Sequence, residues 1–117
     1  MLVVEDRPDN LTIIREILNI KGYTVYEAKN GQEGVEMAWK ERPDLILMDM
    51  HMPVMNGLEA TKHILEIEGL EEIPIIGLTA RAMKGDMEKV LEAGCCDFVS
   101  KPVMPKDLLK KVEQWLS

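Results

Sequence analysis

The chain has 117 residues, of which 46% are hydrophobic and 30% charged, the proportions of an ordinary soluble globular protein. Fourteen Lys and Arg residues against 21 Asp and Glu residues give a net charge of −7, which disfavours binding to nucleic acid phosphates or to an anionic membrane. No apolar run is long enough to span a membrane and no secretory signal opens the sequence, so we expect neither an anchor nor a leader.

Short apolar runs and amphipathic segments alternate along the chain and predict five strands and five helices. Strands are expected at residues 1–4, 24–27, 44–49, 75–78 and 97–100. Pro8 and Pro105 suit the first turn of the first and last helices. Gly22 and Gly94 suit the ends of the first and fourth helices.

Capping residues mark where the other helices begin. Asn30 and Asn56 each precede a Glu by three residues, the spacing of a capping box, and Asp86 is expected to cap the fourth helix. Helical spacing places the following residues inside: Leu11, Ile14, Ile17 and Leu18, then Val35, Ala38 and Trp39, then Leu58, Thr61, Ile64 and Leu65, then Met87, Val90 and Leu91, and finally Leu108, Val112, Trp115 and Leu116.

Five strands alternating with five helices predict an α/β domain whose parallel sheet is covered by helices on both faces. The unbroken apolar runs at residues 45–48 and 75–78 fit strands that are buried on both sides. No linker, repeat or low-complexity segment interrupts the pattern, so we expect residues 1–117 to form a single domain.

Four of the predicted strands end at residues whose chemistry is complementary. Glu5 and Asp6 follow the first strand, Asp49 ends the third, Thr79 follows the fourth and Lys101 follows the fifth. The carboxyl ends of parallel strands share one edge of a sheet, so we expect these side chains to meet in one crevice.

Three carboxylates in one crevice repel one another and raise one another's pKa unless a cation lies among them. Mg²⁺ prefers such hard oxygen ligands and would keep coordination positions for a phosphoryl group. The pattern therefore predicts a site that places a phosphate on a carboxylate with Mg²⁺ as the cofactor, and Mn²⁺ is expected to substitute.

These residues, in this order and at this spacing, resemble the receiver domain of two-component response regulators over the whole chain. The resemblance is carried by Glu5-Asp6, Asp49 with Met52, Pro53 and Gly57, Thr79-Ala80, and Lys101-Pro102. It implies a flavodoxin-like, doubly wound sheet of five parallel strands in the order 2-1-3-4-5 with five helices. The site would lie where the winding direction reverses.

By this resemblance Asp49 is the phospho-acceptor, which needs a cation because an aspartate is a weak nucleophile. Asp6 would bind Mg²⁺ directly, Glu5 would bind it through water, and the backbone carbonyl of His51 would add a ligand. Glu5 stands where the family commonly has Asp, which lengthens the reach to the metal-bound water.

The resemblance also assigns the residues that respond to the phosphoryl group. Lys101 would pair with the phosphoryl oxygens, aimed inward by a cis bond to Pro102. Thr79 would be the switch hydroxyl. Phe98, the only Phe in the chain, would be the aromatic residue that turns inward on activation.

Two further positions are implied to set how long the phosphoryl group persists. His51 and Arg81 lie two residues after Asp49 and Thr79, where the resemblance places the path of the hydrolytic water. Both side chains are bulky, and Arg81 could hold the phosphoryl oxygens by its charge. We therefore expect slow self-dephosphorylation.

The resemblance implies a cytoplasmic signalling domain that receives its phosphoryl group from a sensor histidine kinase or a histidine phosphotransfer protein. It would catalyse only its own phosphorylation and dephosphorylation. Output to a downstream target would pass through the surface of the fourth helix, fifth strand and fifth helix, without direct contact to nucleic acid or membrane. Cys95 and Cys96 are adjacent, which disfavours a disulfide between them and suits a reducing cytoplasm.

Plainer interpretations stand beside these assignments: a turn-capping Asp49, a surface Lys101, an ordinary strand-end Thr79 and a core Phe98. Among whole-chain alternatives, a pseudo-receiver that binds without phosphorylation would be favoured by an incomplete acidic cluster or a missing Lys. An aspartate-nucleophile phosphatase would carry a second Asp where this chain has His51. A flavodoxin would carry a phosphate loop rich in Ser, Thr and Gly after the first strand, and this chain has none.

Overall fold

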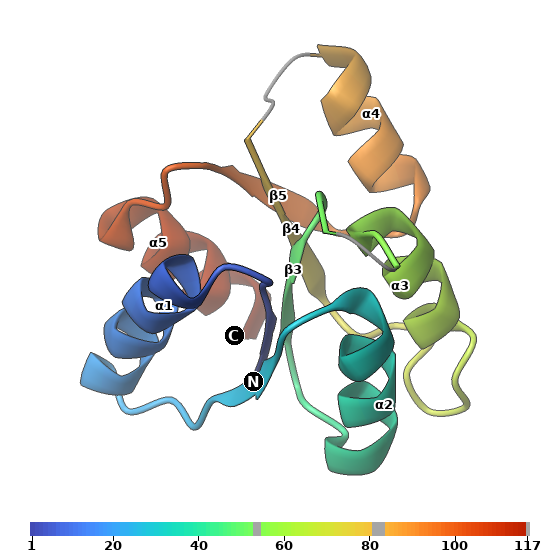
Figure 1. The fold of residues 1–117 in the computed structure, drawn as a ribbon, viewed down its shortest axis with the longest axis horizontal. Coiled ribbons are helices and arrows are strands. Elements are labelled where there is room, and N and C mark those ends of the chain that lie inside the picture. Colours follow the sequence, from blue (N-terminus) through green and yellow to red (C-terminus); the bar gives the residue numbers. More distant parts are fainter. Residues whose placement is uncertain (53–54, 81–83, 117) are drawn as a thin grey trace.

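The computed structural model describes residues 1–52, 55–80 and 84–116, in which strands and helices alternate (Figure 1). The strands of this part are β1 (Leu2–Val4), β2 (Tyr26–Ala28), β3 (Ile46–Asp49), β4 (Ile75–Thr79) and β5 (Asp97–Ser100). The helices are α1 (Pro8–Ile20), α2 (Gly31–Glu41), α3 (Gly57–Leu65), α4 (Lys84–Glu92) and α5 (Pro105–Leu116). Every predicted element is present, although β2 lies slightly later in the chain than the predicted range 24–27. None of the helices in the described ranges is long and apolar enough to cross a membrane.

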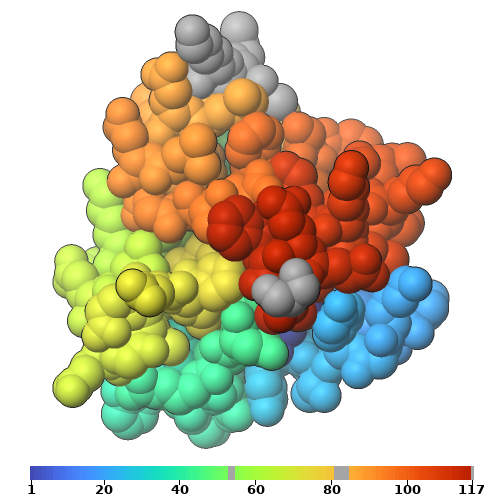
Figure 2. Space-filling view, turned by 180° about the vertical axis from the view of Figure 1, so that it is seen from behind, coloured from blue at the N-terminus to red at the C-terminus, as the bar shows by residue number. Residues whose placement is uncertain are grey.

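The strands form one parallel sheet in the order β2-β1-β3-β4-β5, as predicted. Helices α1 and α5 cover one face of the sheet, and α2, α3 and α4 cover the other (Figure 1). From behind, the segment from α4 through α5 forms a continuous surface, coloured orange to red in Figure 2. After β1 the chain adds β2 on one side of it and then β3 on its other side. The winding direction therefore reverses between β1 and β3.

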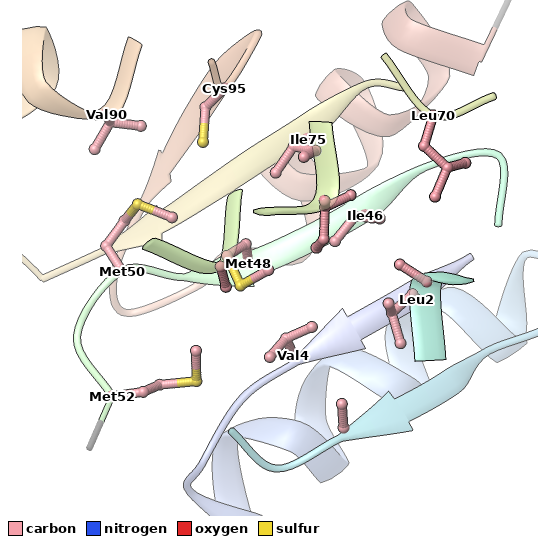
Figure 3. Close-up of a cluster of buried hydrophobic side chains, with 14 residues drawn as sticks. Leu2, Val4, Ile46, Met48, Met50, Met52, Leu70, Ile75, Val90 and Cys95 are labelled. Carbon is pink, nitrogen blue, oxygen red and sulfur yellow. The ribbon is translucent and has the colours of Figure 1, made fainter. Parts of the chain in front are cut away.

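Alternate residues of the central strands supply the two halves of the core. Val3, Leu47 and Ile76 pack toward α1 and α5. Leu2, Val4, Ile46, Met48 and Ile75 pack toward α2 and α3 on the other face, where Figure 3 shows them close together. All of these side chains are fully buried, and burying each one stabilises the fold by about 2 kcal/mol.

Helix α2 and helix α3 begin as the capping boxes predicted. The Asn30 side chain accepts a hydrogen bond from the Glu33 amide at 2.8 Å, and Asn56 accepts one from the Glu59 amide at 2.9 Å. The prediction for α4 was wrong, because the helix begins at Lys84 and Asp86 lies within its first turn rather than at its cap.

Three residues expected to be buried are instead exposed: Trp39 by 63%, Leu91 by 47% and Trp115 by 37%. Helix α2 approaches β1 through its small residues, because a Cβ atom at Gly34 would lie 2.9 Å from Val4 Cγ2. That contact fixes a narrow buried face of Gly31, Gly34 and Ala38. Trp39 is one position, or about 100°, further round the helix and therefore faces outward.

Candidate functional site

The carboxyl ends of β1, β3, β4 and β5 meet at one edge of the sheet (Figure 1). Val4 of β1 pairs with Met48 of β3, so the next residues, Glu5 and Asp49, are neighbours across the two strands. Asp49 in turn pairs with Leu78 of β4, the residue before Thr79. Strand pairing alone thus brings together side chains that are far apart in the sequence.

The carboxylates of Glu5, Asp6 and Asp49 form a compact cluster. Each contributes one oxygen to a group whose members all lie within 4.8 Å of one another. Glu5 is fully buried and Asp49 is 1% exposed, whereas Asp6 is half-buried. Such a cluster stores repulsion that a cation would relieve.

Lys101 supplies one positive charge to this cluster. Its Nζ lies 2.9 Å from Glu5 Oε1 and 3.2 Å from Asp49 Oδ2. The peptide bond between Lys101 and Pro102 is cis. The Lys101 side chain reaches inward from the end of β5 and contacts both buried carboxylates.

Burial and pairing act on these groups in opposite directions. Burial raises the pKa of the Glu5 carboxyl, the neighbouring Asp49 raises it further, and Lys101 opposes both. Burial by itself lowers the pKa of the Lys101 ammonium, but the hydrogen bond to Glu5 and the charges of Asp49 and Glu5 outweigh it and raise that pKa. Lys101 is consequently held in its charged form.

The described side chains leave one carboxylate atom unsatisfied. Asp6 Oδ1 is buried and has no hydrogen-bond partner in the described part of the chain. A buried unpaired carboxylate oxygen is costly unless a ligand binds it. Three carboxylates that converge on one point, one with a free oxygen, fit Mg²⁺, which binds oxygen ligands and commonly keeps several waters.

The remaining predicted residues lie around this centre. The His51 amide donates to Asp49 Oδ1 at 3.1 Å, while the His51 side chain is exposed at the rim. Thr79 is buried at the end of β4, and Phe98 is half-buried on β5. Arg81 lies outside the described residues, and the joint role of His51 and Arg81 in phosphoryl lifetime stays a prediction.

Gly57 supports the site in a way the sequence does not reveal. A Cβ atom there would collide with the backbone oxygen of Asp49 and lie 2.7 Å from Met50 Cα. The first turn of α3 therefore packs directly against the backbone that carries Asp49. In the sequence Gly57 is only one element of the family pattern, and no local signal announces this contact.

A cavity of about 420 Å³ also lies beside the site and was not predicted. It is lined by Met50, His51, Met52, Asn56, Leu58, Thr79, Asp86, Lys89 and Val90. Thr79 thus stands between the carboxylate cluster and an open space next to α4.

Comparison with protein families and with known proteins gives a consistent result. The family model for the response regulator receiver domain matches residues 1–113. The polar-differentiation response regulator DivK of Brucella anthropi is 37% identical over 116 residues, which cover 99% of this chain and 94% of DivK.

Solved structures with the same fold come from sensor kinases and chemotaxis proteins. The receiver domain of a sensor histidine kinase from Pseudomonas aeruginosa, with a magnesium ion coordinated in its active site cleft, is 40% identical and superposes with a TM-score of 0.92. The match covers 98% of this chain and 94% of that one. Chemotaxis protein CheY4 of Vibrio cholerae is 30% identical with a TM-score of 0.94, covering 98% and 96% of the two chains.

Proposed function

Because this chain belongs to the receiver-domain family of response regulators, we propose that it accepts a phosphoryl group on the carboxylate of Asp49. The donor is a phosphohistidine of a sensor histidine kinase or a histidine phosphotransfer protein. The observation that carries the proposal is the convergence of the Glu5, Asp6 and Asp49 carboxylates at the edge of the sheet, with Lys101 paired to Glu5 and Asp49.

In the proposed transfer, an oxygen of Asp49 forms a bond to phosphorus as the bond between phosphorus and the donor imidazole breaks. Lys101 is placed to balance charge on the phosphoryl oxygens, since its Nζ already lies 3.2 Å from Asp49 Oδ2. The His51 amide orients the Asp49 carboxylate through the other oxygen, Oδ1. The phosphoryl group is later lost when water hydrolyses the acyl phosphate at the same site, without a separate enzyme.

Glu5, Asp6, Asp49 and the backbone carbonyl of His51 would hold the metal, with Asp6 in direct contact and Glu5 acting through water. Mg²⁺, when bound, supplies neutralising charge for the transferring group. Mn²⁺ is expected to substitute, because it accepts the same oxygen ligands.

We assign the output surface to α4, β5 and α5, which Figure 2 shows as one continuous region. Residues 1–80 contain fifteen acidic and seven basic residues, whereas residues 81–117 contain six acidic and seven basic ones. Among the described residues here, the exposed large apolar side chains are Leu91 of α4, Trp115 of α5 and Met104, which directly precedes α5. A nearly neutral surface with apolar side chains, on an otherwise acidic domain, suits a protein partner.

The proposed setting is the cytoplasm, where the phosphohistidine donors of this family act and where Cys95 and Cys96 remain reduced. Direct binding to nucleic acid or membrane forms no part of the proposal, because the net charge of −7 opposes both.

The direct test of function is incubation with acetyl phosphate, followed by intact mass measurement. Wild-type protein should gain one phosphoryl group with Mg²⁺ or Mn²⁺ and none with EDTA. No gain with either metal would favour the pseudo-receiver alternative.

Metal binding can be measured without phosphorylation. Mg²⁺ at a hundred times its dissociation constant is expected to stabilise wild type by about 2.7 kcal/mol. Asp6→Ala should remove most of this gain and Glu5→Ala less of it, because Asp6 carries the unsatisfied oxygen. Thermal melts across a Mg²⁺ titration make the comparison, and a larger loss with Glu5→Ala would contradict the proposed ligand roles.

A further inference from the structure

Asp97, the first residue of β5, is fixed from three sides. Lys111 Nζ lies 2.7 Å from its Oδ1, the Trp115 indole donates to its Oδ2 at 3.1 Å, and the Phe98 amide donates to Oδ1 at 2.8 Å. Burial raises the pKa of the Asp97 carboxyl, but these hydrogen bonds outweigh burial and lower it. Asp97 is therefore a charged anchor that ties β5 to α5.

The anchored ammonium of Lys111 also lies over the ring of Phe98, 4.9 Å from its centroid. This is within the range of a cation–π contact. The hydrogen bond to Asp97 limits the freedom of the Lys111 side chain, so the ammonium is held where it meets the ring. Phe98, Lys111 and Asp97 together line a groove between β5 and α5.

The cavity beside Thr79 lies on the same side of the sheet as Phe98. Phe98 pairs with Gly77 of β4, and paired residues direct their side chains to the same face. A Cβ atom at Gly77 would lie 2.8 Å from Val90 and 3.5 Å from Met50, both of which line the cavity beside Thr79. Gly77 itself places no side chain beside Phe98, and Val90 packs closely on it, so an inward rotation of Phe98 would carry its ring from the groove toward Val90 and the cavity that Val90 lines.

We infer that Lys111, held by Asp97, acts as a latch that retains Phe98 in the groove between β5 and α5 and so opposes the switch to the activated state. The latch rests on the proposed function and on the expectation, from the family resemblance, that Phe98 turns inward when Asp49 carries a phosphoryl group. Asp97 and Lys111 are positioning residues, because they touch neither the phosphoryl group nor the metal. They set the concentration of a phosphoryl analogue at which the Phe98 ring turns inward.

Removing the contact between Lys111 and Phe98 shifts the equilibrium toward the inward position of the ring. The shift equals the free energy that this contact contributed to the outward position. For a partly exposed cation–π contact the change is about two- to fivefold in the equilibrium. The latch variants should therefore reach half-activation at a two- to fivefold lower concentration of a phosphoryl analogue.

The test uses the full chain with beryllofluoride and Mg²⁺ as the probe. Since Phe98 is the only phenylalanine, ¹³C-labelled phenylalanine gives NMR signals from this ring alone. Lys111→Met removes the ammonium and keeps the length of the side chain. Asp97→Asn releases Lys111 by a second route, and Lys110→Met is the matched control on the neighbouring exposed residue of α5.

Both latch variants should lower the beryllofluoride midpoint two- to fivefold and move the unliganded Phe98 signals toward their liganded position, whereas Lys110→Met should do neither. In a Phe98→Leu background, Lys111→Met should no longer shift a midpoint read from backbone amide signals. If wild type responds to beryllofluoride but Lys111→Met matches Lys110→Met, the latch is refuted and the proposed function stands. If wild type does not respond at all, the proposed function fails and the latch fails with it.

Discussion

Replacing Lys101 by Met should slow phosphorylation of Asp49 by about 10²- to 10³-fold, the usual cost of removing one preorganised group that stabilises developing charge. Lys101 Nζ lies 2.9 Å from Glu5 Oε1 and 3.2 Å from Asp49 Oδ2, so its ammonium contacts both buried carboxylates. Initial rates with acetyl phosphate at saturating Mg²⁺ measure the loss. Lys106→Met, on the exposed first turn of α5, is the matched control and should retain the wild-type rate.

The same substitution should destabilise the metal-free fold at neutral pH by about 3 kcal/mol, because it leaves buried charge without its partner. The pKa of Glu5 is already raised by burial and by Asp49, and loss of the Lys101 charge raises it further. A carboxyl whose pKa is higher in the folded state stabilises the fold when protonated, and this contribution is lost as pH rises through the folded pKa. The deficit of the variant should therefore shrink as pH falls toward the ordinary carboxyl range.

Urea unfolding at several pH values tests this account. Added Mg²⁺ should stabilise Lys101→Met more than wild type, because the metal replaces part of the missing positive charge. A deficit that is independent of both pH and Mg²⁺ would mean that Lys101 contributes through packing rather than through its charge.

Gly57→Ala is expected to lower stability by about 3 kcal/mol, the upper end for an overpacked site. The added Cβ would collide with the Asp49 backbone oxygen and press on Met50 Cα, neither of which can move without displacing β3. The melting temperature should fall by roughly 10 °C. Phosphorylation should also slow, because the backbone that carries Asp49 must shift.

Gly85→Ala is the matched control for this prediction. Gly85 lies in α4, and a Cβ there would meet nothing within 4 Å. Alanine favours a helix over glycine, so this variant should gain about 0.5–1 kcal/mol. If Gly57→Ala melted at the wild-type temperature, the close packing of α3 on β3 would be wrong.

The meeting of the site residues was predictable because each of them lies at the carboxyl end of a strand. Glu5, Asp49 and Thr79 each follow a short apolar run, and parallel pairing places such ends at one edge of the sheet whatever the details of packing. The capping boxes at Asn30 and Asn56 were equally local, and the structure has both hydrogen bonds. Each capping box depends on residues three positions apart, and the site depends on strand pairing that the alternation of strands and helices already predicts.

Features that depend on which face of a helix meets the sheet could not be predicted. Trp39 looks like part of a buried stripe, but the small residues Gly34 and Ala38 set the contact face of α2. Trp115 is partly exposed, with its indole N–H bonded to Asp97 of β5, eighteen positions away in the sequence. No periodic pattern encodes either contact, because each depends on which helix face meets which strand.

Mapping the phosphoryl group to a residue tests the central claim most directly. After Mg²⁺-dependent phosphorylation, borohydride reduces an acyl phosphate to an alcohol, and peptide mass spectrometry then identifies the reduced residue. We predict reduction at Asp49 alone and no reduction in Asp49→Asn. Reduction at Glu5, at Asp6 or at a carboxylate outside the cluster, or equal labelling of Asp49→Asn, would contradict the account.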